Sequence, residues 1–274
     1  MQRSSSKPDP SETTRAQVRA RYGGIAAGKD LQLAPATGPS CCGESSPSSC
    51  CGDPSVSAQL GYTPDQLAHL PPGANLGLGC GNPTAILALQ PGQTVLDLGS
   101  GAGIDCFLAA KKVGARGSVI GVDMTPEMLT KARGNARTGG YRNVEFRLGE
   151  IEHLPVADAS IDVVISNCVI NLAPDKGSVY REAFRVLRPG GQLAVSDVIA
   201  TRPITDRERA DPSLWSSCSS GALEVREVKA LLTRAGFVKV RVDLKLPGRT
   251  PDSLQGPASL GVVSADIQAN RPRK

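Results

Sequence analysis

The sequence predicts an α/β fold with a mostly parallel sheet, followed by a small C-terminal α+β region. Between residues 94 and 200, short runs rich in β-branched residues alternate with segments of helical periodicity. Such alternation is typical of a parallel sheet covered by helices on both faces. After residue 200 the chain contains one clear helical segment, at 222–236, and then a strand-like run at 237–246.

The elements of the sheet region follow from local patterns. We expect strands at 94–98, 118–123, 143–149, 161–167 and 192–199, and helices at 104–114, 125–137 and 174–191. Thr63-Pro64 and Thr125-Pro126 each predict a helix start, because Thr is a good N-cap and Pro fits the first helical position. Pro-Gly-Gly at 189–191 predicts the end of the third of these helices.

Composition divides the chain into three regions. Residues 1–60 are rich in Ser, Pro and Gly and carry cysteines in pairs at 41–42 and 50–51, which favours a largely flexible segment with one short helix at 13–24. We expect residues 61–200 to form the cofactor-binding domain and residues 201–274 to form the substrate-binding region.

Charge and cysteine content limit the function. The formal net charge is +5, from Lys and Arg scattered along 274 residues, which argues against nucleic-acid binding. No run approaches the roughly 18 apolar residues of a membrane span, and the N-terminus has no apolar signal segment. We expect a cytoplasmic monomer, in which eight cysteines are more typical of metal, redox or catalytic chemistry than of a disulfide framework.

A Gly-rich loop joins the first strand to the first helix of the sheet region. Its glycines are Gly99, Gly101 and Gly103, and glycine allows a tight turn and close approach to a ligand. The sixth position is Ile104, so the spacing departs from the dinucleotide fingerprint. Together with Asp97, two residues before the loop, it favours a cofactor that presents an amino-acid moiety and a sulfonium.

Acidic residues after the next strands complete this pattern. Asp123 ends the second strand, where a carboxylate accepts hydrogen bonds from ribose hydroxyls; the alternative is a contribution to the helix cap at Thr125. Ile151 is placed to cover an adenine ring, with Glu150 or Glu152 accepting from its amine; the alternative is that these glutamates are exposed. The combination indicates S-adenosylmethionine.

Three cysteines lie in loops that the fold would bring towards this site. Cys168 follows the fourth strand beside Asn167, Cys218 precedes a helix, and Cys80 lies in a Gly-rich turn before the first strand. Each has the alternative of being a small buried hydrophobic residue, which is the role we expect for Cys106. The cysteines do not show the CxxC spacing that is typical of a zinc site. Three separate thiols instead favour a soft, three-coordinate, thiophilic centre such as a trivalent metalloid.

Several segments together resemble the arsenite methyltransferases, a class I methyltransferase family. These segments are GLGCGNP, DLGSGAGIDCFLAA, GVDMTPEML, SNCVINLAPDK, YREAFRVLRPGGQLAVSDV and LWSSCSSGAL, and they fall within about residues 75 to 236. The resemblance implies a Rossmann-like class I methyltransferase fold. It also implies methyl transfer from S-adenosylmethionine to trivalent arsenic, a detoxification reaction, with Met124 and Asn167 among the cofactor contacts.

The resemblance also assigns roles to the cysteines. It implies that Cys80, Cys168 and Cys218 bind arsenic as thiolates and that an N-terminal cysteine, Cys51 or Cys50, is a redox partner of Cys80. The Gly-rich setting of Cys80 would then make it a mobile thiol. The substrate would be arsenite or its thiol conjugates, with a thiol reductant of glutathione or thioredoxin type for turnover.

Two other functions remain open at this point. One is a quinone- or sterol-type C- or O-methyltransferase, although an aromatic content of 3% argues against an apolar acceptor pocket. The other is a non-catalytic, thiol-rich protein that sequesters metalloids. Sequestration would not need Asp97, the glycine loop and Asp123, which are all present.

Overall fold

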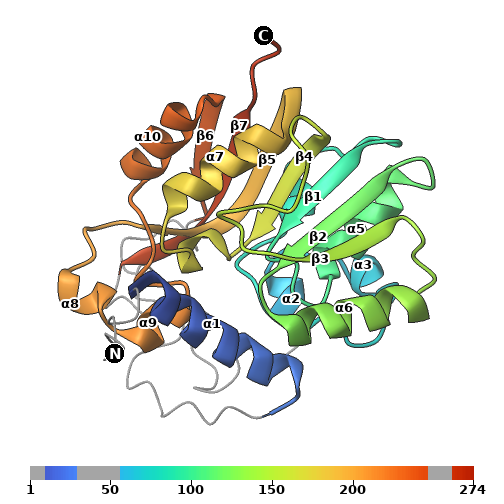
Figure 1. The fold of residues 1–274 in the computed structure, drawn as a ribbon, viewed down its shortest axis with the longest axis horizontal. Coiled ribbons are helices and arrows are strands. Elements are labelled where there is room, and N and C mark those ends of the chain that lie inside the picture. Colours follow the sequence, from blue (N-terminus) through green and yellow to red (C-terminus); the bar gives the residue numbers. More distant parts are fainter. Residues whose placement is uncertain (1–9, 30–55, 246–260) are drawn as a thin grey trace, which may run out of the picture.

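The computed structural model describes residues 10–29, 56–245 and 261–274, and these form one sheet flanked by helices (Figure 1). The sheet has seven strands in the order β3-β2-β1-β4-β5-β7-β6. The strands are β1 Thr94–Leu98, β2 Ser118–Asp123, β3 Val144–Leu148, β4 Ile161–Asn167, β5 Leu187–Ala200, β6 Val238–Leu244 and β7 Val262–Asn270. Cys50 and Cys51 lie outside the described residues.

The helices are α1 Pro10–Ala26, α2 Val56–Gln59, α3 Pro64–Ala68, α4 Pro83–Ile86, α5 Ile104–Val113, α6 Pro126–Thr138, α7 Lys176–Val186, α8 Asp206–Arg209, α9 Pro212–Ser216 and α10 Val225–Ala235, with a 3₁₀ turn, η1, at Ile170–Leu172. None of the helices within the described residues is long and apolar enough to cross a membrane.

The sheet confirms the expected α/β class. Strands β1 to β5 pair in parallel, whereas β7 is antiparallel to both β5 and β6. Side chains of β1 alternate between two buried clusters: Leu96 and Leu98 pack with α7 and α10 on one face, and Val95 packs with α5 and α6 on the other. Successive side chains point to opposite faces of the sheet, and because both faces are buried the strands are almost wholly apolar.

The expected helix end at 189–191 is wrong. Helix α7 ends at Val186, and β5 begins at Leu187. The Pro-Gly-Gly run therefore lies in the first part of β5, where the pairing with β4 shifts register between Ile161 and Val163. Proline is tolerated in a strand at such an irregularity. At Thr63 the prediction is confirmed, since its side chain caps α3 in a reciprocal capping box.

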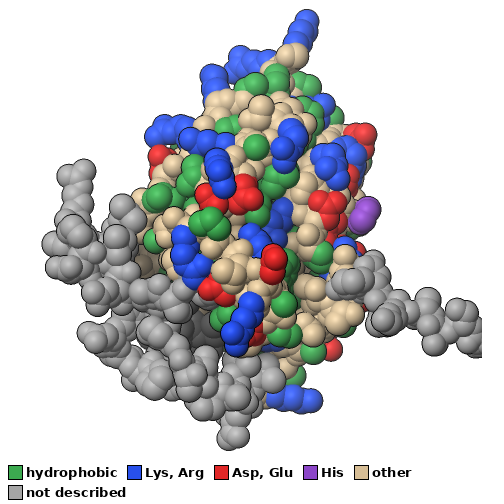
Figure 2. Space-filling view, turned by 90° about the vertical axis from the view of Figure 1, so that its left-hand side faces the viewer, with side chains coloured by type: hydrophobic (Ala, Val, Ile, Leu, Met, Phe, Trp, Pro, Cys, Tyr) green, Lys and Arg blue, Asp and Glu red, His purple; other side chains and the backbone are tan. Residues whose placement is uncertain are grey.

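Strand β7 has no counterpart among the expected elements. It comes from residues 262–270 and inserts between β5 and β6. The strands that follow residue 200 therefore belong to the same sheet as those that precede it. Figure 2 shows basic and acidic side chains interspersed over the middle of one face of the molecule, with mainly basic side chains in its upper part.

The carboxyl ends of β1, β2, β4 and β5 meet at one edge of the sheet. Strand order reverses between β1 and β4, and ligands of open α/β sheets bind at such a switch point. Helix α1 lies across this edge, beside α9 and α6 (Figure 1). The edge is therefore roofed by a segment from the start of the chain.

Candidate active site

A pocket opens at this edge of the sheet. Its lining comes from the glycine loop, the ends of β2 and β4, the segment 74–80, the segment 217–219 and helix α1. Asp97, Gly99, Gly101, Asp123, Met124, Ile151, Glu152, Asn167, Cys80, Cys168 and Cys218 all line it. Gly103 is not among the lining residues and instead occupies the N-cap position of α5.

Backbone geometry explains the glycines of the loop. Gly99 has a φ of +69°, and a Cβ there would lie 2.4 Å from Val169 Cγ2. Gly103 has a φ of +99°, and a Cβ there would lie 2.7 Å from the Phe107 ring. L side chains rarely adopt such φ values. The loop therefore requires glycine both for its turn and for its packing.

Asp123 holds the loop against the start of α6. Its Oδ2 accepts a hydrogen bond from Gly101 N at 2.9 Å and its Oδ1 accepts one from Thr125 N at 2.8 Å. Thr125 occupies the N-cap position but makes no side-chain cap bond, so the expected cap by its hydroxyl is wrong. The carboxylate also lines the pocket, and its contact with ribose remains a prediction.

Asp97 is a buried acid at the floor of the pocket. Its Oδ2 accepts a hydrogen bond from Cys106 Sγ at 3.2 Å. Burial, with the neighbouring Asp105 carboxylate, raises the pKa of Asp97 well above its usual range. A bound cation would favour the charged form, which suits the positive methyl donor. Cys106 is fully buried, as expected of a core residue.

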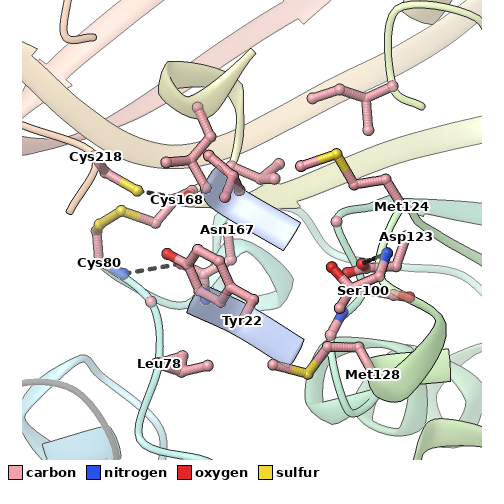
Figure 3. A pocket seen from close by; sticks show the side chains of 18 of the residues that line it. Tyr22, Leu78, Cys80, Ser100, Asp123, Met124, Met128, Asn167, Cys168 and Cys218 are labelled. Atoms are coloured by element: carbon pink, nitrogen blue, oxygen red, sulfur yellow. Dashed lines mark hydrogen bonds between the residues drawn. A yellow bond between two sulfur atoms is a disulfide. The ribbon is translucent and has the colours of Figure 1, made fainter. Parts of the chain in front are cut away.

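Helix α1 brings an arginine to the expected adenine side of the pocket. Arg15 Nη2 lies 3.0 Å from Glu152 Oε1, and Arg15 Nε lies 3.2 Å from Glu150 Oε2. Val18 and Tyr22 of the same helix also line the pocket, and Tyr22 lies across it in Figure 3. The sequence indicates a helix near 13–24, but no local pattern shows where that helix packs.

The three predicted site cysteines converge on the other side of the pocket (Figure 3). Cys80 is disulfide-bonded to Cys168, with their Cα atoms 5.5 Å apart. Cys218 Sγ donates a hydrogen bond to Cys168 O at 2.9 Å. The sequence did not indicate the Cys80–Cys168 pairing. Cys51 and Cys50, the predicted redox partners of Cys80, lie outside the described residues, and a bond from Cys80 to either would require the Cys80–Cys168 disulfide to open; that pairing stays a prediction.

Two of these cysteines have an unusual backbone conformation. Cys168 has a φ of +56° and Cys218 a φ of +64°, a left-handed region that is unfavourable by roughly 1–2 kcal/mol for a side chain with Cβ. Backbone hydrogen bonds hold both, from Cys168 N to Ser196 O and from Cys218 N to Trp215 O. Such strain is concentrated at functional sites.

The glycines around Cys80 serve a close approach to β4. Asn167 Oδ1 accepts a hydrogen bond from Cys80 N at 3.0 Å, and Asn167 Nδ2 donates to Gly81 O at 2.8 Å. A Cβ at Gly79 would lie 2.8 Å from Asn167 Nδ2. In the structure these glycines therefore let the turn dock on Asn167, whereas the sequence suggested that they make Cys80 mobile.

Asp197 is a site residue that the sequence reasoning missed. One of its carboxylate oxygens and the sulfurs of Cys80 and Cys168 all lie within 4.8 Å of one another. Burial raises the pKa of Asp197 to about 6, although hydrogen bonds from Val198 N and from the backbone of Asn171 and Ile170 act to lower it. It lies in the run SDV of β5, where nothing in the local pattern indicates nearness to sulfur.

Comparisons with known proteins agree with this geometry. Residues 89–236 match a family model described as a methyltransferase domain. The arsenite methyltransferase of Halobacterium salinarum is 50% identical over 97% of this chain and 68% of its own length. That of Aquipseudomonas alcaligenes is 48% identical over 64% of this chain and 52% of its own length. The chain thus spans about half to two thirds of these relatives.

A solved structure shows the same relationship. The crystal structure of an arsenic(III) S-adenosylmethionine methyltransferase from Chlamydomonas reinhardtii has a TM-score of 0.58 and 37% identity, over 79% of this chain and 73% of that one. Fold and glycine loop define a class I, S-adenosylmethionine-dependent methyltransferase. Within that class, the chain belongs to the arsenite methyltransferase family.

Proposed function

We propose that this chain transfers methyl groups from S-adenosylmethionine to trivalent arsenic held by Cys80, Cys168 and Cys218. The observation that carries the proposal is the convergence of these cysteines on one pocket with the glycine loop. They come from three separate loops, and three thiols that face one pocket favour a soft, thiophilic centre.

The Cys80–Cys168 disulfide must be reduced before arsenic binds. Two electrons and two protons come either from two molecules of a monothiol or from one molecule of a dithiol, which gives two Cys thiols and one disulfide of the reductant. Arsenite then exchanges its hydroxide ligands for thiolates, and the thiol protons leave with those hydroxides as water. We propose a glutathione- or thioredoxin-type reductant, because arsenic can bind both sulfurs only after this reduction.

The residues of the opposite wall fit the methyl donor. The glycine loop approaches the ligand through its backbone, Asp97 would face the positive amino-acid end and Asp123 the ribose hydroxyls. Ile151 would cover the adenine ring. When bound, S-adenosylmethionine supplies an electrophilic methyl carbon. In this proposal residues 61–200 hold the donor, while the region 201–274 adds Cys218 to the acceptor side.

The chain then acts mainly by positioning. As the As–C bond forms, the C–S bond of the sulfonium would break and S-adenosylhomocysteine would leave; an arsenic lone pair carries no proton, so this displacement needs no general base. Holding both reactants in line can contribute an effective molarity on the order of 10⁵ M or more. Helix α1 supports this role, since it places Val18 and Tyr22 in the lining of the pocket.

The test is an assay of the pure, full-length protein with arsenite, S-adenosylmethionine and glutathione, read by chromatography of methylated arsenicals. We expect methylated product that depends on all three additions. Stoichiometric arsenite binding without product would support sequestration instead. Product from a quinone or sterol but not from arsenite would support the other methyltransferase class. Cytoplasmic location and a monomeric state remain proposals, which fractionation and light scattering test.

A further inference from the structure

A buried hydrogen-bond network lies beneath the Cys80 turn. The Tyr62 hydroxyl donates to both oxygens of Asp105, at 2.8 and 3.0 Å. Asn167 Nδ2 lies 2.9 Å from Tyr62 Oη and 3.2 Å from Asp105 Oδ2. Tyr62 and Asp105 are each only 2–3% exposed. The three side chains therefore fix one another in a setting where an unmade hydrogen bond is unfavourable.

The same Asn167 amide grips the backbone on either side of Cys80. Its oxygen accepts from Cys80 N and its nitrogen donates to Gly81 O. Two glycines make this grip possible, since a Cβ at Gly79 would meet Asn167 and a Cβ at Gly81 would lie 2.7 Å from Ser196 Oγ. The turn is thus shaped to fit one amide.

Asn167 also precedes Cys168 at the end of β4. One residue is thereby bonded to the backbone of one cysteine and covalently joined to the other. Cys168 is anchored in turn by its N–H to Ser196 O at 2.8 Å. These contacts hold the backbones of Cys80 and Cys168 at a Cα separation of 5.5 Å.

We propose that Asn167 is a positioning residue that holds Cys80 beside Cys168, and that Tyr62 and Asp105 lock its amide in the orientation that does so. This inference rests on the proposed function only in naming arsenic as the ligand of the sulfur pair. Its role is distinct from cofactor contact, because the amide oxygen faces Cys80 N.

Two different reactions should respond equally to the position of Cys80. Disulfide formation and arsenite chelation both join Cys80 to Cys168, so both depend on the effective concentration of one sulfur at the other. Loosening the amide should weaken both by the same factor. Loss of one hydrogen bond corresponds to about three- to tenfold in an equilibrium constant.

The experiment uses Tyr62→Phe and Asn167→Ala in the full chain. The first measurement is the equilibrium of the Cys80–Cys168 disulfide with glutathione, read by alkylation and peptide mass spectrometry. The second is arsenite affinity of the reduced protein, read through the single tryptophan, Trp215, which packs in the cluster that contains Cys168 and Cys218. We expect both constants to fall together, by about three- to tenfold.

Two variants serve as controls. Tyr141→Phe makes the same chemical change in a ring that packs on Phe107, away from the pocket. Asn143→Ala removes an amide that donates to Gly114 O and so weakens the fold elsewhere. Both should leave the disulfide equilibrium unchanged. Equal shifts of the disulfide equilibrium in Tyr141→Phe and Tyr62→Phe would mean that loss of any such hydroxyl loosens the whole fold, and this would overturn the proposal.

The outcomes also separate the two proposals. A wild-type protein that binds no arsenite would refute the proposed function, while the disulfide equilibrium would still report on the position of Cys80. A disulfide constant that Tyr62→Phe leaves at its wild-type value would overturn the positioning role, whatever the arsenite result. If Asn167→Ala fails to fold, Tyr62→Phe carries the test alone, because it removes a single oxygen atom.

Discussion

The two walls of the pocket are built in different ways. The donor wall comes from one run of nine residues, Asp97 to Asp105, of which all but Leu98 and Gly103 line the pocket, and from Asp123 on the neighbouring strand. The acceptor wall joins Cys80 to Cys168 across 88 positions and Cys168 to Cys218 across 50. Local sequence therefore specifies the donor wall, whereas only the folded chain assembles the acceptor wall.

The walls also differ in chemistry. Buried acids line the donor wall, where Asp97, Asp105 and Asp123 all have raised pKa values because of burial. On the acceptor wall, Cys168 and Cys218 lie among apolar groups that include Val18, Leu172 and Trp215, and one buried acid, Asp197, lies near the sulfurs of Cys80 and Cys168. A positive ligand is favoured on one side and a soft one on the other. Each wall should then fail separately when it is changed.

The largest expected effect is on the acceptor wall. Cys168→Ser should lower arsenite methylation by at least about 10³-fold, because oxygen is a poor ligand for a thiophilic centre, yet leave S-adenosylmethionine affinity within about twofold of wild type. Product analysis and calorimetry measure the two. Cys106→Ala, which changes a buried thiol outside the acceptor wall, should keep arsenite affinity, although it removes the hydrogen bond to Asp97 Oδ2 on the donor wall. Wild-type rates in Cys168→Ser would contradict a thiolate site.

The converse change is Asp97→Asn on the donor wall. Loss of a charge-assisted contact to the positive donor should weaken S-adenosylmethionine binding by about 10- to 100-fold. Arsenite affinity of the reduced protein should stay as in wild type. Calorimetric titration with each ligand checks this pair of results. A parallel loss of arsenite affinity would mean that the two walls are not independent.

The buried acids predict a pH dependence of stability. Burial raises the pKa of Asp105 to about 6, so the folded state binds more protons than the unfolded state between about pH 4 and pH 6. The contribution of Asp105 is complete below about pH 4 and is lost as pH rises through 6. Asp197 acts in the same direction.

Asp105→Asn should remove its part of this slope. Relative to wild type, the variant should gain about 2–3 kcal/mol between pH 4 and pH 7, as measured by urea unfolding of the reduced protein at several pH values. Above about pH 7 the two curves should run parallel. A difference that does not vary with pH would show that Asp105 does not titrate in this range.

The smallest expected effect concerns the roof of the pocket. Arg15→Ala releases Glu152 from α1 and should weaken S-adenosylmethionine binding by about three- to tenfold, which is typical of one partly buried charged contact. Arg19→Ala is the matched control, because Arg19 pairs mainly with the exposed Glu12. Equal effects from both substitutions would point to α1 as a whole rather than to the contact at Glu152.

Much of the fold was predictable because its signals are local. Strands β1, β2 and β4 lie at the expected residues, and the capping box at Thr63 is complete. Apolar runs and caps act within a few residues, so they read directly from the sequence. At α7 the local signal failed, because pairing with β4 extends β5 back to Leu187.

The sequence by itself determined the parallel sheet, the glycine loop with Asp97 and Asp123, and the set of three cysteines. Tertiary structure alone decided that β7 completes the sheet, that α1 roofs the pocket and that Cys80 pairs with Cys168 above Asp197. The physical reason is range. Turns and strands depend on neighbours in the chain, whereas sulfur partners and roofs depend on which distant surfaces pack together.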